Sequence, residues 1–396
     1  MTIIEDLLNG FRYRQMRIAR EWIAVPPPSN PCLSIVGDYD CDGVCSVAIM
    51  DRMAKLLGWN TALHTARRSQ GYGAGDSLFT DVMRWDPSVI VFCDIGTNDL
   101  DGIKRFIDEG RRVIIIDHHE PEPGCLLSTM PHHMVCLLNP LVESSGHSRE
   151  NLIGLCTAGL ARIFAEFVMG ESMGPSEYSF ICQLACVGTV GDMANASHPI
   201  NDQIISEGLA FIKDYPDPAV STIVSKSFDK GEIDYRYVAF NISPVINAPG
   251  KIYDDANSAL AMFTNLDRGK AIDCANYCIR CNEWKRQEAE RCKRVALKRL
   301  ECHHGTGVVT GPFPTGIVGQ LANKLLNGSD FKRCICVSDL SFTDIYKGSC
   351  RGEGSLDYMK GFREHLVRLG GHKGACGFTI EKINLEKLYD YVRITS

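Results

Sequence analysis

The stretch Ile114-Ile115-Ile116-Asp117-His118-His119 is an apolar run that stops at an acid and two adjacent histidines. An apolar run of this length, preceded by Arg111 and Arg112, is typical of a buried parallel strand. Residues just past such a strand lie in the crevice where open α/β sheets bind ligands. The sequence therefore predicts a parallel sheet with a polar site at the carboxyl end of this strand.

Two earlier apolar segments end in the same way. Leu33-Ser34-Ile35-Val36 leads into Gly37-Asp38-Tyr39-Asp40-Cys41-Asp42-Gly43, and Val89-Ile90-Val91-Phe92-Cys93 leads into Asp94. Asp192 follows the apolar end of a predicted helix. Because the carboxyl ends of parallel strands meet at one edge of a sheet, we expect these acids and the histidines to form one polar cluster.

Composition indicates a globular chain of two or three domains. The 396 residues are 45% hydrophobic, and we find no apolar stretch long enough to span a membrane and no apolar signal sequence at the start. The 18 cysteines fall mostly in apolar segments, where a reduced thiol acts as a small hydrophobe. We expect a cytoplasmic protein without a membrane partner.

Charge is divided unevenly along the chain, whose net charge is −6. From Glu283 onward there are 19 Lys and Arg against 13 Asp and Glu, so the acidic excess lies in residues 1–282. An acidic part that could hold divalent cations, followed by a basic part that could hold phosphates, suits a polyanionic substrate. The overall charge argues against a protein that coats nucleic acid indiscriminately.

The order of predicted elements gives four regions. Residues 1–30 are an N-terminal helix and a proline-rich linker, and residues 31–266 begin with alternating strands and helices, hence a parallel sheet. Residues 267–302 contain no proline and predict a long connector helix. Residues 303–396 predict a smaller α/β domain, with helices over 317–326 and 356–369.

The acids and histidines at the strand ends suit Mn²⁺ or Mg²⁺ better than structural zinc, because no thiolates cluster with them. Asp40 and Asp42 can reach one or two ions, Asp94 and Asp192 can bridge or cap them, and His118 supplies an imidazole. Asp117 is the candidate to orient His118. Two ions about 3.5–4 Å apart would activate a shared water for phosphoester hydrolysis.

Two other motifs have competing interpretations. Cys274, Cys278 and Cys281 have the spacing that holds a four-iron cluster, but they lie in a continuous helical pattern, where they are expected to pack. Gly370-Gly371 would let backbone N–H groups approach an anion, with His372, Lys373 and Arg351 adding charged donors, or it simply forms a turn.

Together these motifs resemble the DHH phosphoesterases, and within them the RecJ-type single-strand nucleases, from about residue 31 onward. The resemblance rests on the order of several motifs: Gly37–Gly43, Arg67 with Gly71-Tyr72-Gly73, Asp94, Asp117-His118-His119, Asn139-Pro140, Gly188–Asp192, Asn247–Lys251, Gly316–Gly319 and Gly370-Gly371-His372. It implies a parallel-sheet DHH domain joined by a connector helix to a smaller α/β DHHA1 domain that binds substrate.

The resemblance also implies roles for individual residues. Asp40, Asp42, Asp94, His118 and Asp192 would be ligands of two Mn²⁺ or Mg²⁺ ions, with Mn²⁺ preferred. The catalytic group would comprise His119, facing the scissile phosphate, with Asp117 and Asp38. The substrate contacts would be Arg67, Asn247, Lys251, Arg351, Gly370, Gly371 and His372.

The chain departs from the family pattern at several positions. Val36 stands where many members have a histidine, and Asp38 is the candidate to replace that ligand. Lys251 replaces an arginine and loses its bidentate fork, and Cys350 replaces a usual glycine. No residues follow Ser396 for the OB-fold of larger RecJ proteins, so weaker grip on long strands is expected.

The resulting hypothesis is a two-metal exonuclease that degrades single-stranded DNA from the 5′ end, with a single-strand-binding protein as a candidate partner. One alternative is a ribonuclease for short oligonucleotides or a nucleotide phosphatase of the same family, because nothing in the sequence visibly reads a 2′-hydroxyl. A second alternative is a non-catalytic replication scaffold, which should have lost metal ligands that this chain keeps.

Overall fold

The computed structural model describes residues 14–67, 73–122, 133–142, 152–227, 231–340 and 343–395, apart from the side chain of His372. Gly71 and Tyr72 and most of the predicted N-terminal helix therefore lie outside the described residues. The chain divides into two compact units, Met1–Asn282 and Glu283–Ser396. This division coincides with the point where the charge balance changes sign.

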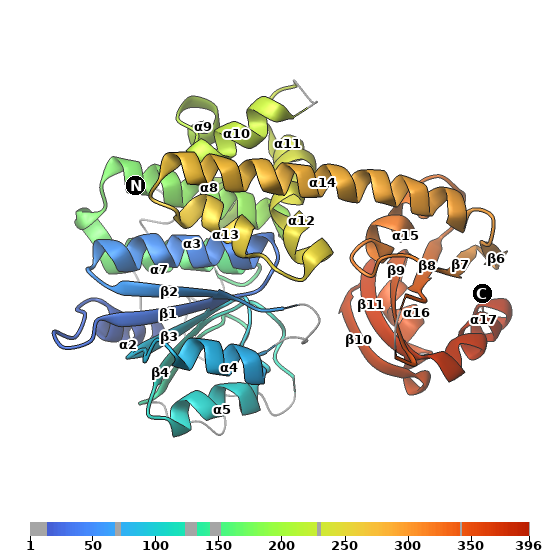
Figure 1. The fold of residues 1–396 in the computed structure, drawn as a ribbon, viewed down its shortest axis with the longest axis horizontal. Coiled ribbons are helices and arrows are strands. Elements are labelled where there is room, and N and C mark those ends of the chain that lie inside the picture. The colour runs from blue at the N-terminus through green and yellow to red at the C-terminus, as the bar shows by residue number, and fades with distance from the viewer. Residues whose placement is uncertain are drawn as a thin grey trace. The chain divides into compact units, whose positions relative to one another are not determined.

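The first unit is built on a five-stranded sheet with the order β2-β1-β3-β4-β5, in which all neighbouring strands are parallel (Figure 1). The strands are β1 (Cys32–Gly37), β2 (Asn60–Thr65), β3 (Val89–Cys93), β4 (Arg112–Ile116) and β5 (Val135–Leu138). The parallel sheet expected from the sequence is confirmed, and Ile114–Ile116 lies at the end of β4.

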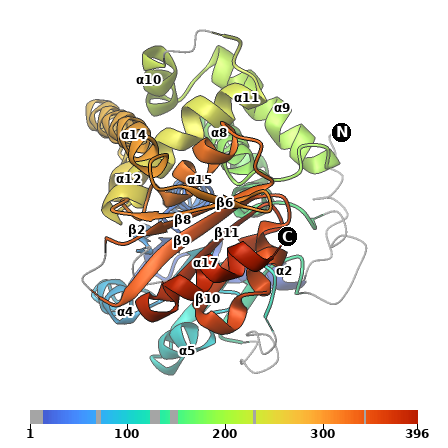
Figure 2. The same ribbon diagram turned by 90° about the vertical axis from the view of Figure 1, so that its right-hand side faces the viewer.

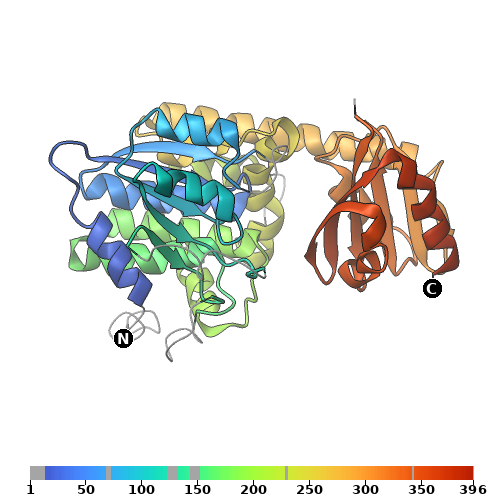
Figure 3. The ribbon, with the colours of Figure 1, turned by 90° about the horizontal axis from the view of Figure 1, so that it is seen from below.

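Successive residues of each strand enter two different cores. Ile114 and Ile116 pack in a large cluster with α3 (Cys41–Leu56), α7 (Thr157–Met169) and α8 (Pro175–Gly191). Ile115 packs on the other face, with α4 (Asp76–Met83) and α5 (Leu100–Asp108). Figure 3 shows α4 and α5, in light blue and teal, covering that face. Burial on both faces explains why the strands are continuously apolar.

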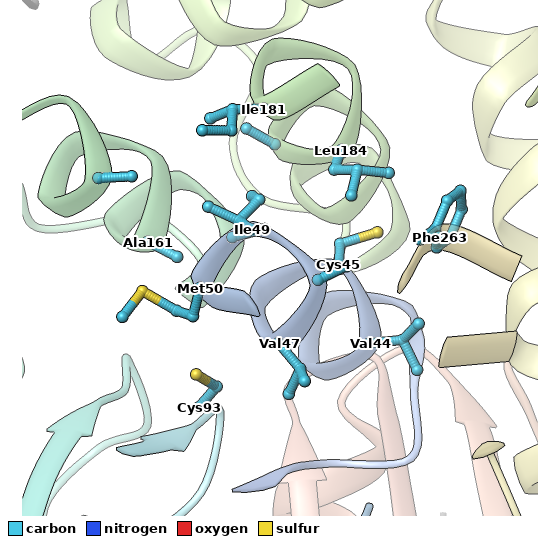
Figure 4. Packing of buried hydrophobic residues seen from close by; sticks show 14 of the residues in the cluster. Val44, Cys45, Val47, Ile49, Met50, Cys93, Ala161, Ile181, Leu184 and Phe263 are labelled. Carbon is cyan, nitrogen blue, oxygen red and sulfur yellow. The ribbon is translucent and has the colours of Figure 1, made fainter. Parts of the chain in front are cut away.

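The centre of the larger core is α3, which is buried along most of its length. Figure 4 shows Cys45 and Ile49 of α3 beside Ile181 and Leu184 of α8, with Phe263 nearby. Since α3 begins directly after the Asp38–Asp40 loop, this packing fixes one end of the predicted site.

Further helices extend this unit. They are α2 (Arg14–Ile23), α9 (Pro199–Asp214), α10 (Pro218–Lys226), α11 (Tyr235–Tyr237), α12 (Ser243–Tyr253) and α13 (Asn257–Thr264). A short π-helical segment, Val238–Ile242, leads into α12. None of the described helices is long and apolar enough to cross a membrane.

The long helix α14 covers Arg268–Ala296, so it ends earlier than the predicted Cys302. Glu301–His303 instead forms β6, paired antiparallel with β7. Cys278 and Cys281 are buried within α14 and Cys274 is partly buried, as expected for thiols that pack along a helix.

The second unit contains a six-stranded mixed sheet with the order β10-β11-β9-β8-β7-β6 (Figure 2). Its other strands are β7 (Thr306–Gly311), β8 (Arg333–Ser338), β9 (Ile345–Gly352), β10 (Leu366–His372) and β11 (Ala375–Glu381). Its helices are α15 (Val318–Leu326), α16 (Ser355–Lys360) and α17 (Leu385–Ile394). A second α/β unit is therefore present, as predicted.

One predicted element of this unit is wrong. The helix expected over 356–369 is interrupted, because α16 ends at Lys360 and β10 begins at Leu366. Leu366 is buried while Val367 is half exposed. The alternation of buried and exposed side chains and the pairing with β11 therefore make this segment a strand. A short apolar pattern alone does not separate helix from strand.

Candidate active site

The loop between β1 and α3 is closed by its own acids. Asp40 caps α3, with Oδ1 accepting from the N–H groups of Asp42 (3.0 Å) and Gly43 (3.2 Å). Asp38 accepts from the N–H of Tyr39 at 2.8 Å. A Cβ atom on Gly43 would lie 2.6 Å from the carbonyl oxygen of Asp38, so only glycine permits this tight turn.

Asp42 is held by the first turn of α7. Its two carboxylate oxygens accept from the N–H groups of Thr157 and Ala158, each at 2.8 Å. The positive end of the helix dipole favours a negative charge at this position. Asp42 is only 1% exposed, so these donors fix both its place and its orientation.

Asp94 follows β3 in a strained conformation. Its φ is 66°, a left-handed value that is uncommon for residues other than glycine. Oδ1 of Asp94 accepts from the hydroxyl of Thr157 at 3.1 Å, and the residue is 2% exposed. Strain of this kind persists where surrounding structure holds it and is common at functional sites.

His118 lies among three of the predicted acids. Its Nε2 is 3.4 Å from Oδ1 of Asp94 and 3.9 Å from Oδ2 of Asp42, and its Nδ1 is 4.0 Å from Oδ2 of Asp192. These acids come from the first turn of α3, the end of β3 and the end of α8. The convergence that the sequence predicts is therefore present in the first unit.

Asp117 holds His119, whereas we expected it to orient the ring of His118. Its Oδ1 lies 2.8 Å from Nδ1 of His119 and also accepts from the backbone N–H groups of both histidines. Its Oδ2 accepts from the N–H of Thr97 at 3.0 Å. With these contacts Asp117 positions the loop after β4 and the ring that follows it.

Asp192 reaches the cluster because small residues let α8 approach closely. A Cβ atom on Gly188 would lie 2.4 Å from Cβ of Ala158 and 3.1 Å from Oδ1 of Asp42. A Cβ atom on Gly191 would lie 2.7 Å from Sγ of Cys41. The two glycines of the Gly188–Asp192 motif therefore serve the packing of the site.

Burial and mutual repulsion raise the pKa values of several acids. Burial raises the pKa of Asp94 most, and the charges of Asp42 and Asp40 add to it. The same causes raise the pKa of Asp192 to about 8, and burial raises the pKa of Asp42 and of Asp38. So many carboxylates in a buried space are costly unless protons or cations neutralise them.

The two histidines differ in charge. Burial lowers the pKa of His118, which favours the neutral ring that ligates metals. Burial also acts to lower the pKa of His119, but the hydrogen bond and charge of Asp117 raise it to about 9. Burial acts to raise the pKa of Asp117, yet His119 holds it below its usual range. A neutral ring thus lies beside a charged Asp–His pair.

Ligand atoms of the cluster form three groups in which all atoms lie within 4.8 Å of one another. These groups are Asp94 with His118 and His119, Asp42 with His118 and Asp192, and Asp38 with Asp40 and Asp94. Oxygen donors with few imidazoles suit hard divalent cations. The donor set and the crowding of acids fit a pair of such ions.

Val36 points away from this cluster. Its side chain is fully buried in the core that includes Phe92 and Ile115, on the α4–α5 face of the sheet. Asp38 is 3% exposed and belongs to one of the three groups of ligand atoms. Asp38 is therefore close enough to act with Asp40 and Asp94.

The Asn247–Lys251 motif lies in α12 and packs against the acidic loop. Oδ1 of Asn247 accepts from the N–H of Cys41 at 2.9 Å. A Cβ atom on Gly250 would lie 2.6 Å from the carbonyl oxygen of Tyr39. Asn247 thus braces the loop that carries Asp40 and Asp42, in addition to the substrate contact predicted for it and for Lys251.

Arg67 is exposed just past β2 and lines a pocket of about 280 Å³. Other lining residues include Trp85, Asp255 and Asn257. Because β2 pairs with β1, this pocket lies one strand away from the acidic loop. The contact of Arg67 with the nucleic-acid backbone stays a prediction.

The remaining predicted substrate residues belong to the second unit. Nη1 of Arg351 donates to the carbonyl oxygens of Cys350 (2.9 Å) and Cys376 (3.0 Å). Gly370 and Gly371 lie in β10 opposite Gly377 and Cys376, so they are part of a strand. His372 ends β10, and its side chain is outside the described residues.

Three supporting residues were not assigned a role from the sequence. Thr157 contacts both Asp42 and Asp94, and Thr97 donates to Asp117. Asn139 donates from Nδ2 to the hydroxyl of Thr97 and to the carbonyl of His119. Asn139 follows β5 directly, so its place at the same sheet edge was a usable signal.

Comparison with known proteins gives a family match within the first unit. Residues 33–189 match the model of the DHH family, N-terminal domain, and they contain every predicted ligand except Asp192. The first unit therefore contains a segment that is similar to the DHH family, N-terminal domain.

The chain as a whole is similar to RecJ. It is 26% identical to the single-stranded-DNA-specific exonuclease RecJ of Bacillus subtilis, over 95% of this chain and 47% of that protein. It is also 26% identical to RecJ of Thermus thermophilus, over 88% of this chain and 50% of that protein. The chain thus spans about half the length of these curated relatives.

Solved structures show the same fold. RecJ of Thermus thermophilus in complex with Mn²⁺ matches with a TM-score of 0.79 and 20% identity, over 96% of this chain and 54% of that one. An exonuclease RecJ bound to manganese matches with a TM-score of 0.75 and 21% identity, over 96% of this chain and 93% of that one.

Proposed function

We propose that this chain is a metal-dependent exonuclease that hydrolyses phosphodiester bonds of single-stranded DNA from the 5′ end. The observation that carries the proposal is the convergence of Asp38, Asp40, Asp42, Asp94 and Asp192 on His118 and His119, as three overlapping groups of ligand atoms. The relatives named single-stranded-DNA-specific exonucleases supply the substrate class.

Asp40, Asp42, Asp94, His118 and Asp192 are the residues that would hold two divalent cations, with Asp38 as a further donor. We propose Mn²⁺ or Mg²⁺, with Mn²⁺ preferred, since similar structures are described with each of these ions. When bound, such ions lower the pKa of a shared water and neutralise the phosphoryl oxygens. The raised pKa values of Asp94 and Asp192 mean that cations would displace protons on binding.

The protein's own part in catalysis is to place charge beside the scissile phosphate. Asp117 fixes His119 through Nδ1 and keeps its ring protonated at neutral pH. This ring would donate a hydrogen bond from Nε2 to a phosphoryl oxygen, where negative charge grows in the transition state. The side chain of His119 is 39% exposed, so a strand can reach it.

Residues 303–396 are assigned to substrate binding as a DHHA1 domain, as the resemblance of Gly316–Gly319 and Gly370-Gly371-His372 implies, and the excess of basic residues after Asn282 suits this role. The proposed contacts are Arg67, Asn247, Lys251, Arg351, Gly370, Gly371 and His372. Action on single strands in the cytoplasm, beside a single-strand-binding protein, is part of the same proposal.

The test is digestion of end-labelled oligonucleotides with and without Mn²⁺. Strands with a 5′-phosphate, a 5′-hydroxyl or a blocked 3′ end separate the two polarities, and duplex DNA is expected to resist. Preference for very short RNA over long DNA would favour the ribonuclease alternative and overturn the DNA assignment.

A pair of matched variants makes this test specific to the site. Asp94→Asn is expected to lose activity, whereas Asp202→Asn, which changes an exposed acid of α9, is expected to cut at the wild-type rate. Equal activity of all three proteins would assign the observed cleavage to a contaminant or to another site.

A further inference from the structure

Two exposed tyrosines stack on each other in the first unit, outside the acidic cluster. The rings of Tyr253 and Tyr277 have centroids 6.4 Å apart and planes at 29°. Tyr253 is 56% exposed and Tyr277 is 37% exposed. The pair therefore leaves stacked aromatic surface facing solvent.

The pair is attached to the active-site loop through α12. Tyr253 is the last residue of α12, whose Asn247 accepts from the N–H of Cys41. Tyr253 follows Asn247 by six positions in the helix, a rise of about 9 Å at ~1.5 Å per residue. Tyr253 therefore lies at the C-terminal end of the short helix whose middle carries Asn247, the residue that braces the acidic loop.

The second tyrosine, Tyr277, also lies on a helix that is anchored in the core. Tyr277 lies on α14, which runs beside α12 in Figures 1 and 2. Ala275 and Cys278 of α14 are fully buried in the large core of the first unit. Because these neighbours anchor the helix, the exposed ring of Tyr277 is held in place before any ligand binds.

Positive charge accompanies the rings. The guanidinium of Arg280 lies 5.9 Å from the centre of the Tyr277 ring. An aromatic face with a cation beside it suits an unpaired nucleic-acid strand, because bases stack on the ring while the cation attracts the phosphates.

We propose that Tyr253 and Tyr277, with Arg280, form a stacking platform for unpaired bases of a single strand whose end lies in the acidic cluster. The inference rests on the proposed function for the identity of the ligand. Stacking needs no particular base, so the platform grips any sequence. It excludes duplex DNA, whose bases are already paired and stacked.

The test measures binding in EDTA, where cleavage cannot occur. Fluorescence anisotropy with a labelled thymidine oligonucleotide gives the dissociation constant of wild type, Tyr253→Ala, Tyr277→Ala, the double variant and the two Tyr→Phe variants. We expect each alanine variant to bind about tenfold more weakly, as for loss of a base–aromatic stack, and the phenylalanine variants to bind like wild type. Tyr215→Ala, at a 74% exposed tyrosine after α9, is the matched control and should change nothing.

Strands with a single abasic position identify the contact itself. In wild type one or two abasic positions near the 5′ end should weaken binding, and in the double variant the same positions should have no effect. Equal affinity of wild type and the alanine variants, or abasic effects that are unchanged in the double variant, would overturn the platform.

Failure of this inference is distinguishable from failure of the proposed function. A wild-type protein that cuts single strands with Mn²⁺, but whose tyrosine variants bind normally, rejects the platform alone. A protein with base-dependent binding through the two tyrosines and no Mn²⁺-dependent cleavage keeps the platform and rejects the nuclease.

Discussion

Nδ1 of His119 lies 2.8 Å from Oδ1 of Asp117, so the acid that ends the apolar strand holds the second histidine of the doublet. His118, the first histidine, instead faces Asp94 with Nε2 at 3.4 Å. Adjacent residues of one loop thus have different surroundings: a neutral ring among acids and a protonated ring in a charged pair.

Asp117→Asn should disturb the His119 ring without removing a metal ligand. The amide keeps the shape of the side chain but removes the charge that holds the His119 ring protonated. We expect kcat for single-strand cleavage to fall about 10–100-fold, the usual cost of losing such a supporting residue. Calorimetry should still detect Mn²⁺ binding, and loss of that binding would contradict a role of Asp117 limited to His119.

His118→Ala should abolish cleavage while the protein stays folded. The ring is the common neighbour of Asp42, Asp94 and Asp192, so its loss removes a donor from two groups of ligand atoms. Cleavage rate, Mn²⁺ affinity and circular dichroism should be measured on the same preparation. Activity close to wild type would contradict the metal assignment.

Gly188→Ala should damage stability and the site together. Its new Cβ would lie 2.4 Å from Cβ of Ala158, and backbone must move to relieve this contact. Overpacking of this kind costs about 1–3 kcal/mol, measurable as a lower urea midpoint. Gly374→Ala is the matched control, because a Cβ there meets nothing closer than 3.9 Å.

The buried Arg162 gives a prediction on acid stability. Burial acts to raise the pKa of Glu207, but the charge and hydrogen bonds of Arg162 hold it below its usual range. A carboxyl with a depressed folded pKa stabilises the protein above its unfolded pKa, and this contribution disappears as pH falls through the folded pKa.

Glu207→Gln should therefore lower the free energy of unfolding by on the order of 2 kcal/mol at neutral pH. The difference from wild type should shrink at pH values below the ordinary glutamate range. Urea denaturation of both proteins at several pH values checks this. A difference that does not change with pH would mean that the charge of Glu207 contributes no stability.

Much of the site is predictable because its acids follow apolar strands. The ends of β1, β3 and β4 must meet at one edge of a parallel sheet, and this brings Asp38, Asp94 and Asp117 together. The partners of those acids are less predictable. Nothing local in the sequence indicates that the first turn of α7 holds Asp42, or that Asn247 reaches Cys41 across 206 residues of chain.

The second unit contains structure that the sequence pattern does not predict. The segment Gly348–Gly352 is glycine-rich, yet it lies inside β9, where pairing with both β8 and β11 fixes it. Glycines in a strand permit close approach of neighbouring side chains, as at Gly348, where a Cβ would lie 2.2 Å from the Phe378 ring. Such cross-strand contacts are decided by tertiary structure.

The most direct test of the account is a calorimetric titration of Mn²⁺ into the metal-free protein. The account predicts binding of two equivalents, with release of protons from the buried acids, and loss of this binding in Asp94→Asn. No binding by the wild-type protein would contradict the metal site and favour a non-catalytic scaffold.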